Sequence, residues 1–182
     1  MTERYRAALD FATKKHDGQW RKGGAAYITH PVAVAEYLAQ DGMDEDTQIA
    51  GLFHDLLEDT DATEAEILAL GGPEVLEAVK AVTKQKGYVM ADYVAGIKKN
   101  PMALAVKKAD RLHNLRCAPQ ASEDFRRMYI LETLDWYMDL SPEIRRAVRD
   151  LAETLSRPIT ELSLYYQEHS WLQDCDNDSQ KD

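Results

Sequence analysis

Four side chains that can bind a metal or transfer a proton fall within one short stretch, His54-Asp55-Leu56-Leu57-Glu58-Asp59. The residues just before it, 49–53, are apolar or small, as in a buried helix. Charged groups are rarely buried unless they are paired or bound to a metal. In a helix His54 and Asp55 point about 100° apart, and Glu58 and Asp59 follow one turn later, so all four can face one pocket. We interpret the stretch as a metal or acid–base site; the alternative is a solvated helix end.

Two residues elsewhere in the chain could complete a metal site. His30 lies 24 residues before His54, and Asp110 lies within the run 107–114. Two imidazoles and two carboxylates suit a divalent transition metal that keeps open positions for water, and Mn, Fe and Zn are all compatible. Metal sites in helical bundles draw ligands from facing helices, so a ligand far along the chain is expected. The alternatives are a packed or capping His30 and an Asp110 that pairs with a nearby base.

Composition and charge exclude several classes of protein. The chain has 182 residues, 45% of them hydrophobic, which fits one domain with a real core. It has no run of 18 apolar residues and no apolar segment near its N-terminus, so we expect neither a membrane partner nor a signal peptide. Its two cysteines, Cys117 and Cys175, suit a reducing cytoplasm rather than a disulfide framework. A net charge of −10 argues against a nucleic-acid partner but allows a small phosphorylated ligand. The oligomeric state is left open.

Hydrophobic periodicity predicts helices throughout and no convincing strand. The predicted helices cover residues 2–15, 27–40, 44–57, a short helix after Thr63, 74–83, 88–99, 101–116, 122–139, 142–156 and 159–167. The short helix should begin with a capping box formed by Thr63 and Glu66. Residues 21–24, Arg-Lys-Gly-Gly, are predicted to form a basic, flexible loop. We expect an all-α, single-domain helical bundle over residues 1–170, followed by an acidic, disordered tail at 171–182.

Five segments resemble the hydrolase domain of RelA/SpoT-type enzymes and the free-standing small alarmone hydrolases. They occur in the family's order between about residues 5 and 140. The segments are His16-x-Gly18-Gln19-x-Arg21-Lys22, Tyr27-Ile28-x-His30-Pro31, His54-Asp55-x-x-Glu58-Asp59-Thr60, Val82-Thr83-Lys84 and Lys108-Ala109-Asp110-Arg111-Leu112-His113-Asn114. An HD dipeptide alone is a weak signal, whereas these segments together are specific. The resemblance implies a single-domain, HD-type helical bundle.

The resemblance also implies an activity. Such enzymes remove the 3′-pyrophosphate from guanosine tetra- and pentaphosphate, release GDP or GTP, and generally use Mn²⁺. The residues at the matching positions would have three roles: metal ligands at His30, His54, Asp55 and Asp110; catalytic carboxylates that position and activate water at Glu58 and Asp59; substrate-binding residues at Arg21, Lys22 and Asn114.

The chain departs from the family pattern in two places. Residues 24–26, Gly-Ala-Ala, lack the Ser-Gly-x-Pro character common after the Arg-Lys pair, and Cys117 stands where longer members tend to have Thr. Two other functions therefore stay open. One is a phosphohydrolase of another nucleotide, such as an adenine alarmone or a nucleoside monophosphate. The other is a non-catalytic nucleotide-binding regulator, which would be expected to have a broken ligand set.

Overall fold

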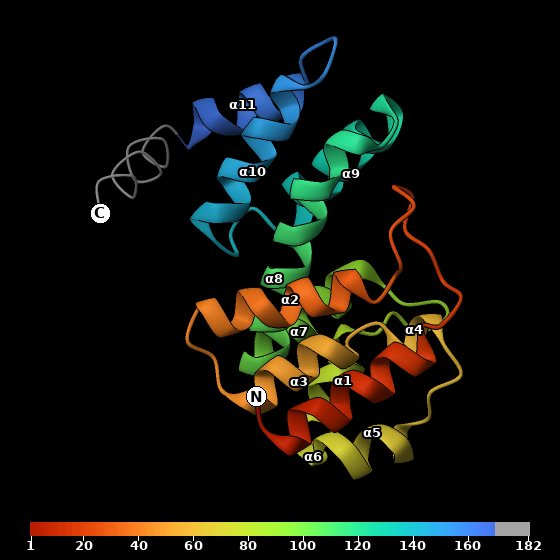
Figure 1. Ribbon diagram of the computed structural model, residues 1–182. Coiled ribbons are helices and arrows are strands. Elements are labelled where there is room, and N and C mark those ends of the chain that lie inside the picture. Colours follow the sequence, from red (N-terminus) through yellow and green to blue (C-terminus); the bar gives the residue numbers. More distant parts are fainter. Residues whose placement is uncertain (170–182) are drawn as a thin grey trace. The chain divides into compact units, whose positions relative to one another are not determined.

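The computed structural model describes residues 1–169, and the predicted disordered tail lies outside them (Figure 1). The all-α class is confirmed, because the only extended pairing among these residues is one isolated bridge between Trp20 and Ala26. The chain forms two compact units, residues 1–113 and the part that begins at Asn114. Helix α8, Pro101–Cys117, runs through that boundary. A single domain over residues 1–170 stays a prediction.

The helices follow the predicted pattern closely. The first unit contains α1 (Glu3–Lys15), α2 (Thr29–Gln40), α3 (Glu45–Phe53), α4 (Leu56–Asp59), α5 (Glu64–Gly71), α6 (Pro73–Val82), α7 (Met90–Lys99) and most of α8. The second contains the end of α8, a 3-10 turn at Ala118–Gln120, α9 (Glu123–Trp136), α10 (Pro142–Glu153) and α11 (Thr160–Glu168). No helix in the described part of the chain is both long enough and apolar enough to cross a membrane.

Side-chain caps explain where several helices begin. The capping box predicted before α5 is confirmed, with the Thr63 side chain accepting from the Glu66 N–H and the Glu66 carboxylate accepting from the Thr63 N–H. Asp44 caps α3 by accepting from the backbone N–H of Thr47 at 2.9 Å. The Asp44 contact fixes the start of α3, the helix that leads to His54.

Helix α3 is the central element of the first unit and contacts α1, α2, α5 and α6 (Figure 1). Its side chains Ile49, Leu52 and Phe53 are fully buried. At Gly51 an added Cβ would lie 2.7 Å from Leu38 Cδ1 of α2, so glycine permits the close approach of the two helices. This approach matters because α2 carries His30 and α3 leads into His54.

The prediction of one helix over residues 44–57 is wrong. Helix α3 ends at Phe53, His54 and Asp55 form a turn, and α4 begins at Leu56. Neighbouring residues of an unbroken helix diverge by about 100°. The turn instead brings His54 Nε2 within 3.1 Å of Asp55 Oδ2, so both side chains serve one cluster.

The second unit packs α10 and α11 against α9. Its core includes the buried side chains of Ile130, Ile144, Val148 and Leu151. Helix α10 begins at a Ser141 cap followed by proline, as the sequence predicted.

Candidate metal centre

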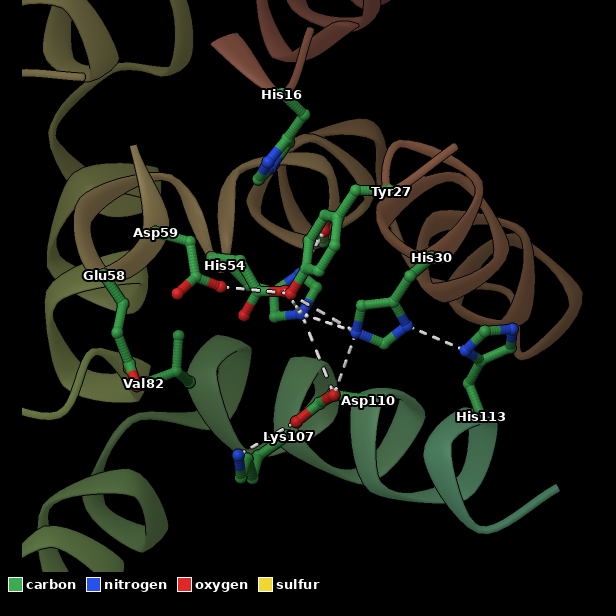
Figure 2. Close-up of polar contacts among 12 residues, drawn as sticks. His16, Tyr27, His30, His54, Glu58, Asp59, Val82, Lys107, Asp110 and His113 are labelled. Atoms are coloured by element: carbon green, nitrogen blue, oxygen red, sulfur yellow. Dashed lines mark hydrogen bonds and ion pairs between the residues drawn. The ribbon is translucent and has the colours of Figure 1, made fainter. Parts of the chain in front are cut away.

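Four side chains predicted to bind a metal converge in the first unit, and Figure 2 labels His30, His54 and Asp110 among them. His54 Nε2 lies 3.2 Å from His30 Nε2 and 3.1 Å from Asp55 Oδ2. Asp110 Oδ1 lies 3.2 Å from His30 Nε2 and 3.8 Å from His54 Nε2. His30, His54 and Asp110 are buried, whereas the Asp55 side chain is 20% exposed. The cluster therefore draws on α2, the turn after α3, and α8.

The spacing of these donor atoms fits one divalent ion. Ligands held at about 2.1 Å from a metal lie about 3.0 Å apart in an octahedron and about 3.4 Å apart in a tetrahedron. Three of the separations between donors here are 3.1, 3.2 and 3.2 Å, and two more are 3.6 and 3.8 Å. Within residues 1–169, one group of donor atoms that all lie within 4.8 Å of one another comprises His30, His54 and Asp110, and Asp55 Oδ2 lies beside the two imidazoles of this group. The donor set of imidazole nitrogen and carboxylate oxygen suits a transition metal.

Each imidazole presents its Nε2 atom to the cluster and has a partner for its Nδ1 atom. His54 Nδ1 lies 2.7 Å from the carbonyl oxygen of Gly51, which can only accept, so this nitrogen carries the hydrogen. His54 can then offer a lone pair at Nε2. His30 Nδ1 lies 2.7 Å from His113 Nδ1.

The charges of the cluster favour a bound cation. Burial alone would raise the pKa of Asp55, but the adjacent His54 outweighs it and holds that pKa at about 2. Burial would likewise raise the pKa of Asp110, yet Lys107 and the two imidazoles keep it well below its usual value. Lys107 Nζ donates to Asp110 Oδ2 at 2.9 Å. Both carboxylates are therefore ionised at neutral pH.

Metal affinity should depend on pH through His54. Burial lowers the pKa of His54, but Asp55, Asp110 and the hydrogen bond to Gly51 outweigh burial and raise it to about 9. In the metal-free protein His54 thus holds a proton that a metal must displace. We expect metal affinity to rise about tenfold per pH unit from pH 7 to about 9 and to fall as pH falls. Competition with a chelating dye, corrected for the dye's own protonation, measures this slope. An affinity that is constant across this range would contradict the assignment of His54.

The two predicted catalytic carboxylates, Glu58 and Asp59, lie differently (Figure 2). Asp59 Oδ2 accepts from the Tyr27 hydroxyl at 3.0 Å, and the same hydroxyl lies 2.8 Å from Asp55 Oδ2. Glu58 Oε2 instead accepts from the backbone N–H of Lys84 at 3.0 Å, in the loop after α6. Both carboxylates are exposed. Asp59 is therefore linked to the cluster through the Tyr27 side chain, whereas Glu58 contacts the backbone of the loop after α6.

The basic segment between α1 and α2 is a loop that contains turns, and its predicted flexibility stays a prediction. Arg21 N–H donates to Ala25 O at 2.8 Å, and Gly24 N–H donates to Arg21 O at 2.9 Å. Gly24 has a φ of 81°, which explains the need for glycine at this position. The Arg21 guanidinium lies close enough to His113 to contribute to lowering its pKa. Arg21 is thus near the cluster, and Lys22 is exposed beside it.

Asn114, predicted to contact the substrate, follows His113 in α8 and begins the second unit. Its proposed role rests on the resemblance.

The sequence predicted no role for three side chains that lie at the cluster. His113 and Lys107 each lie three residues from Asp110, so helical spacing could have placed all three on one face of α8.

Tyr27 links Asp55 and Asp59. Burial and these two carboxylates raise the pKa of Tyr27, which keeps its hydroxyl protonated and able to donate. Burial and the neighbouring His30 lower the pKa of His113 to about 4, which leaves that imidazole neutral.

Comparison with known proteins places the fold and the cluster in one family. The family model described as HD domain matches residues 8–142, which contain every predicted site residue. The chain belongs to the HD-domain family. The solved structure of a metazoan ortholog of SpoT that hydrolyses ppGpp is 24% identical and has a TM-score of 0.64. The match covers 93% of this chain and 97% of that one, and it supports the fold.

Curated relatives confirm the resemblance to the RelA/SpoT-type hydrolase domain. The guanosine-3′,5′-bis(diphosphate) 3′-pyrophosphohydrolase of Spiroplasma citri is 35% identical over 161 residues, covering 82% of this HD-domain chain and 22% of the relative. The bifunctional (p)ppGpp synthase/hydrolase SpoT of Escherichia coli K12 is 38% identical over 150 residues, covering 76% of this chain and 21% of the relative. The chain thus spans about a fifth of the length of the curated relatives that it matches.

Proposed function

We propose that this chain is a metal-dependent 3′-pyrophosphohydrolase of guanosine tetra- and pentaphosphate, which it converts to GDP or GTP and pyrophosphate. One observation carries the proposal. The convergent cluster of His30, His54, Asp55 and Asp110 lies within the HD-domain match, and relatives 35% and 38% identical are named for this hydrolysis. An intact ligand cluster argues against a non-catalytic regulator. We also propose that the protein acts in the cytoplasm.

We propose Mn²⁺ as the ion held by His30, His54, Asp55 and Asp110. A bound divalent ion would lower the pKa of the attacking water and polarise the scissile phosphorus centre. Mixed nitrogen and oxygen ligands also accept Fe and Zn, so metal analysis and restoration of activity ion by ion test this choice.

The protein's own carboxylates would handle the proton of the attacking water. The Tyr27 hydroxyl contacts both Asp59 and Asp55, so it links Asp59 to the cluster. Glu58 lies on the same short helix as Asp59, α4. Both are exposed and therefore accessible to water and substrate. A positioned carboxylate that takes a proton in the transition state typically contributes 10²–10⁴-fold in rate, about the effect expected here.

Arg21 and Lys22 would hold the phosphates of a highly charged nucleotide. Arg21 acts electrostatically on His113, which contacts His30, and Lys22 follows Arg21 in the chain, while the protein as a whole carries a net charge of −10. A local cation pair is therefore needed to attract the substrate. Asn114, from the resemblance, would contact the sugar or its phosphates.

The Arg21→Ala, Lys22→Ala double variant should raise KM at least about tenfold, because each hydrogen bond from a charged group is worth about 1.5–3 kcal/mol. Metal content and the midpoint of thermal unfolding should not change. The matched control is Lys98→Ala, Lys99→Ala, which removes an exposed cation pair at the end of α7. A KM equal to that of the unaltered protein would refute the phosphate-binding role.

A substrate panel tests the proposed activity against its nearest alternative. Purified protein with Mn²⁺ is given guanosine and adenosine nucleotides that carry a 3′-pyrophosphate, beside ordinary deoxynucleoside monophosphates. We expect turnover of the 3′-pyrophosphorylated guanosine nucleotides. Turnover confined to the monophosphates would show an HD-domain phosphohydrolase of another class.

A further inference from the structure

Helix α8 presents three cluster residues at intervals of three, Lys107, Asp110 and His113 (Figure 2). Asp110 faces the imidazoles with Oδ1 and meets Lys107 with Oδ2. His113 lies on the far side of His30 from the other donor atoms. Its Nδ1 atom is 2.7 Å from His30 Nδ1, and His30 Nε2 faces the cluster.

The contact between the two imidazoles permits a single arrangement of hydrogens in a metal-loaded protein. At 2.7 Å the two Nδ1 atoms must share one hydrogen. A metal ligand at His30 Nε2 needs a lone pair there, so the hydrogen of a neutral His30 must sit on its Nδ1 atom. His30 therefore donates and His113 accepts.

The surroundings of His113 hold its ring in place for this contact. The Nδ1 atoms of His30 and His113 are 2.7 Å apart and their ring centroids are 4.9 Å apart, so the two rings meet edge to edge. Their planes are inclined by only 29°, which lets the hydrogen bond lie close to the plane of both rings. Tyr37 of α2 meets His113 edge to face, with centroids 5.9 Å apart. The ring that accepts the hydrogen is thus fixed by α2 as well as by its own helix.

We propose that His113 is a positioning residue for the metal, because it selects the tautomer of His30 and fixes the rotation of that ring. The inference rests on the metal role proposed for His30. Partners of this kind commonly contribute 10–100-fold to metal affinity, because they aim the lone pair and raise the basicity of the ligand.

Two substitutions separate the hydrogen bond from the packing. His113→Asn keeps an acceptor oxygen near the position of Nδ1 but loses the aromatic ring that contacts Tyr37. His113→Phe keeps an aromatic ring there but has no acceptor. We expect His113→Phe to raise the dissociation constant for Mn²⁺ by about 10–100-fold, and His113→Asn to retain most of the affinity.

The measurement is titration with Mn²⁺ in competition with a chelating dye at one fixed pH. It does not depend on turnover, so it stands even if the protein hydrolyses a different nucleotide.

His169→Phe and His169→Asn are matched controls, since His169 stacks on Tyr165 after α11, away from the cluster in sequence. Thermal unfolding of the metal-free variants checks the fold, and His113→Leu replaces His113→Phe if the latter does not fold. Affinity close to normal in His113→Phe, or tighter in it than in His113→Asn, would overturn the proposal.

Discussion

Asp110→Ala will purify with little bound divalent metal and will turn over substrate at least about 10³-fold more slowly. Asp110 is the one proposed ligand on α8, and its Oδ1 atom lies 3.2 Å from His30 Nε2. A bound metal supplies several kcal/mol of transition-state stabilisation, and about 4 kcal/mol corresponds to roughly 10³ in rate. Metal content by atomic emission and kcat are measured on the same preparation.

A control is needed because Asp110 also pairs with Lys107, and both side chains are largely buried. Removal of one partner from such a pair can destabilise the fold by itself. Asp110→Asn keeps an oxygen that accepts from Lys107 while it removes the charge that the metal requires. We expect it to lose the metal but to unfold at nearly the normal temperature. Full metal occupancy in Asp110→Ala would refute the ligand role.

Glu58→Gln will lower kcat by roughly 10²–10⁴-fold and leave metal content and nucleotide affinity nearly unchanged. Glutamine keeps the hydrogen bond that Glu58 Oε2 accepts from the Lys84 N–H, so the local structure survives. What is lost is the ability to take a proton from water. Asp59→Asn should behave in the same way, because asparagine can still accept from Tyr27.

Glu77→Gln is the matched control, since Glu77 is exposed on α6 and pairs only at the surface with Lys80 in the same helix. It should leave kcat unchanged. A kcat close to normal in both Glu58→Gln and Asp59→Asn would end the proposal that these carboxylates are catalytic. Loss of metal in Glu58→Gln would make Glu58 a ligand instead.

The sequence predicted helix positions well because apolar periodicity and caps act locally. Thr63, Asp44 and Ser141 each begin a helix through contacts within four residues. The break at His54 and Asp55 was not predictable in this way, since the apolar pattern continues through it. It arises because both side chains face one cluster, which depends on elements distant in the chain.

The difference between local patterns and contacts between distant elements also explains which parts of the site were predicted. The four proposed metal ligands could be named from their residue types and from a family motif. The side chains that contact them depend on which helices face each other. His113 lies 83 residues from His30, and nothing in the local sequence pairs their rings. Tyr27 lies in one of the segments that resemble the family. Its contact with both Asp55 and Asp59 could not be predicted, because it depends on how the chain folds.

The most direct test of the account is product analysis of guanosine tetraphosphate incubated with the purified protein and Mn²⁺. We expect equal amounts of GDP and pyrophosphate, no reaction with a chelator, and recovery when Mn²⁺ is restored. Asp110→Ala should yield neither product under the same conditions. Release of single phosphates, cleavage at the 5′ side, or turnover that persists in the chelator would contradict a metal-dependent 3′-pyrophosphohydrolase.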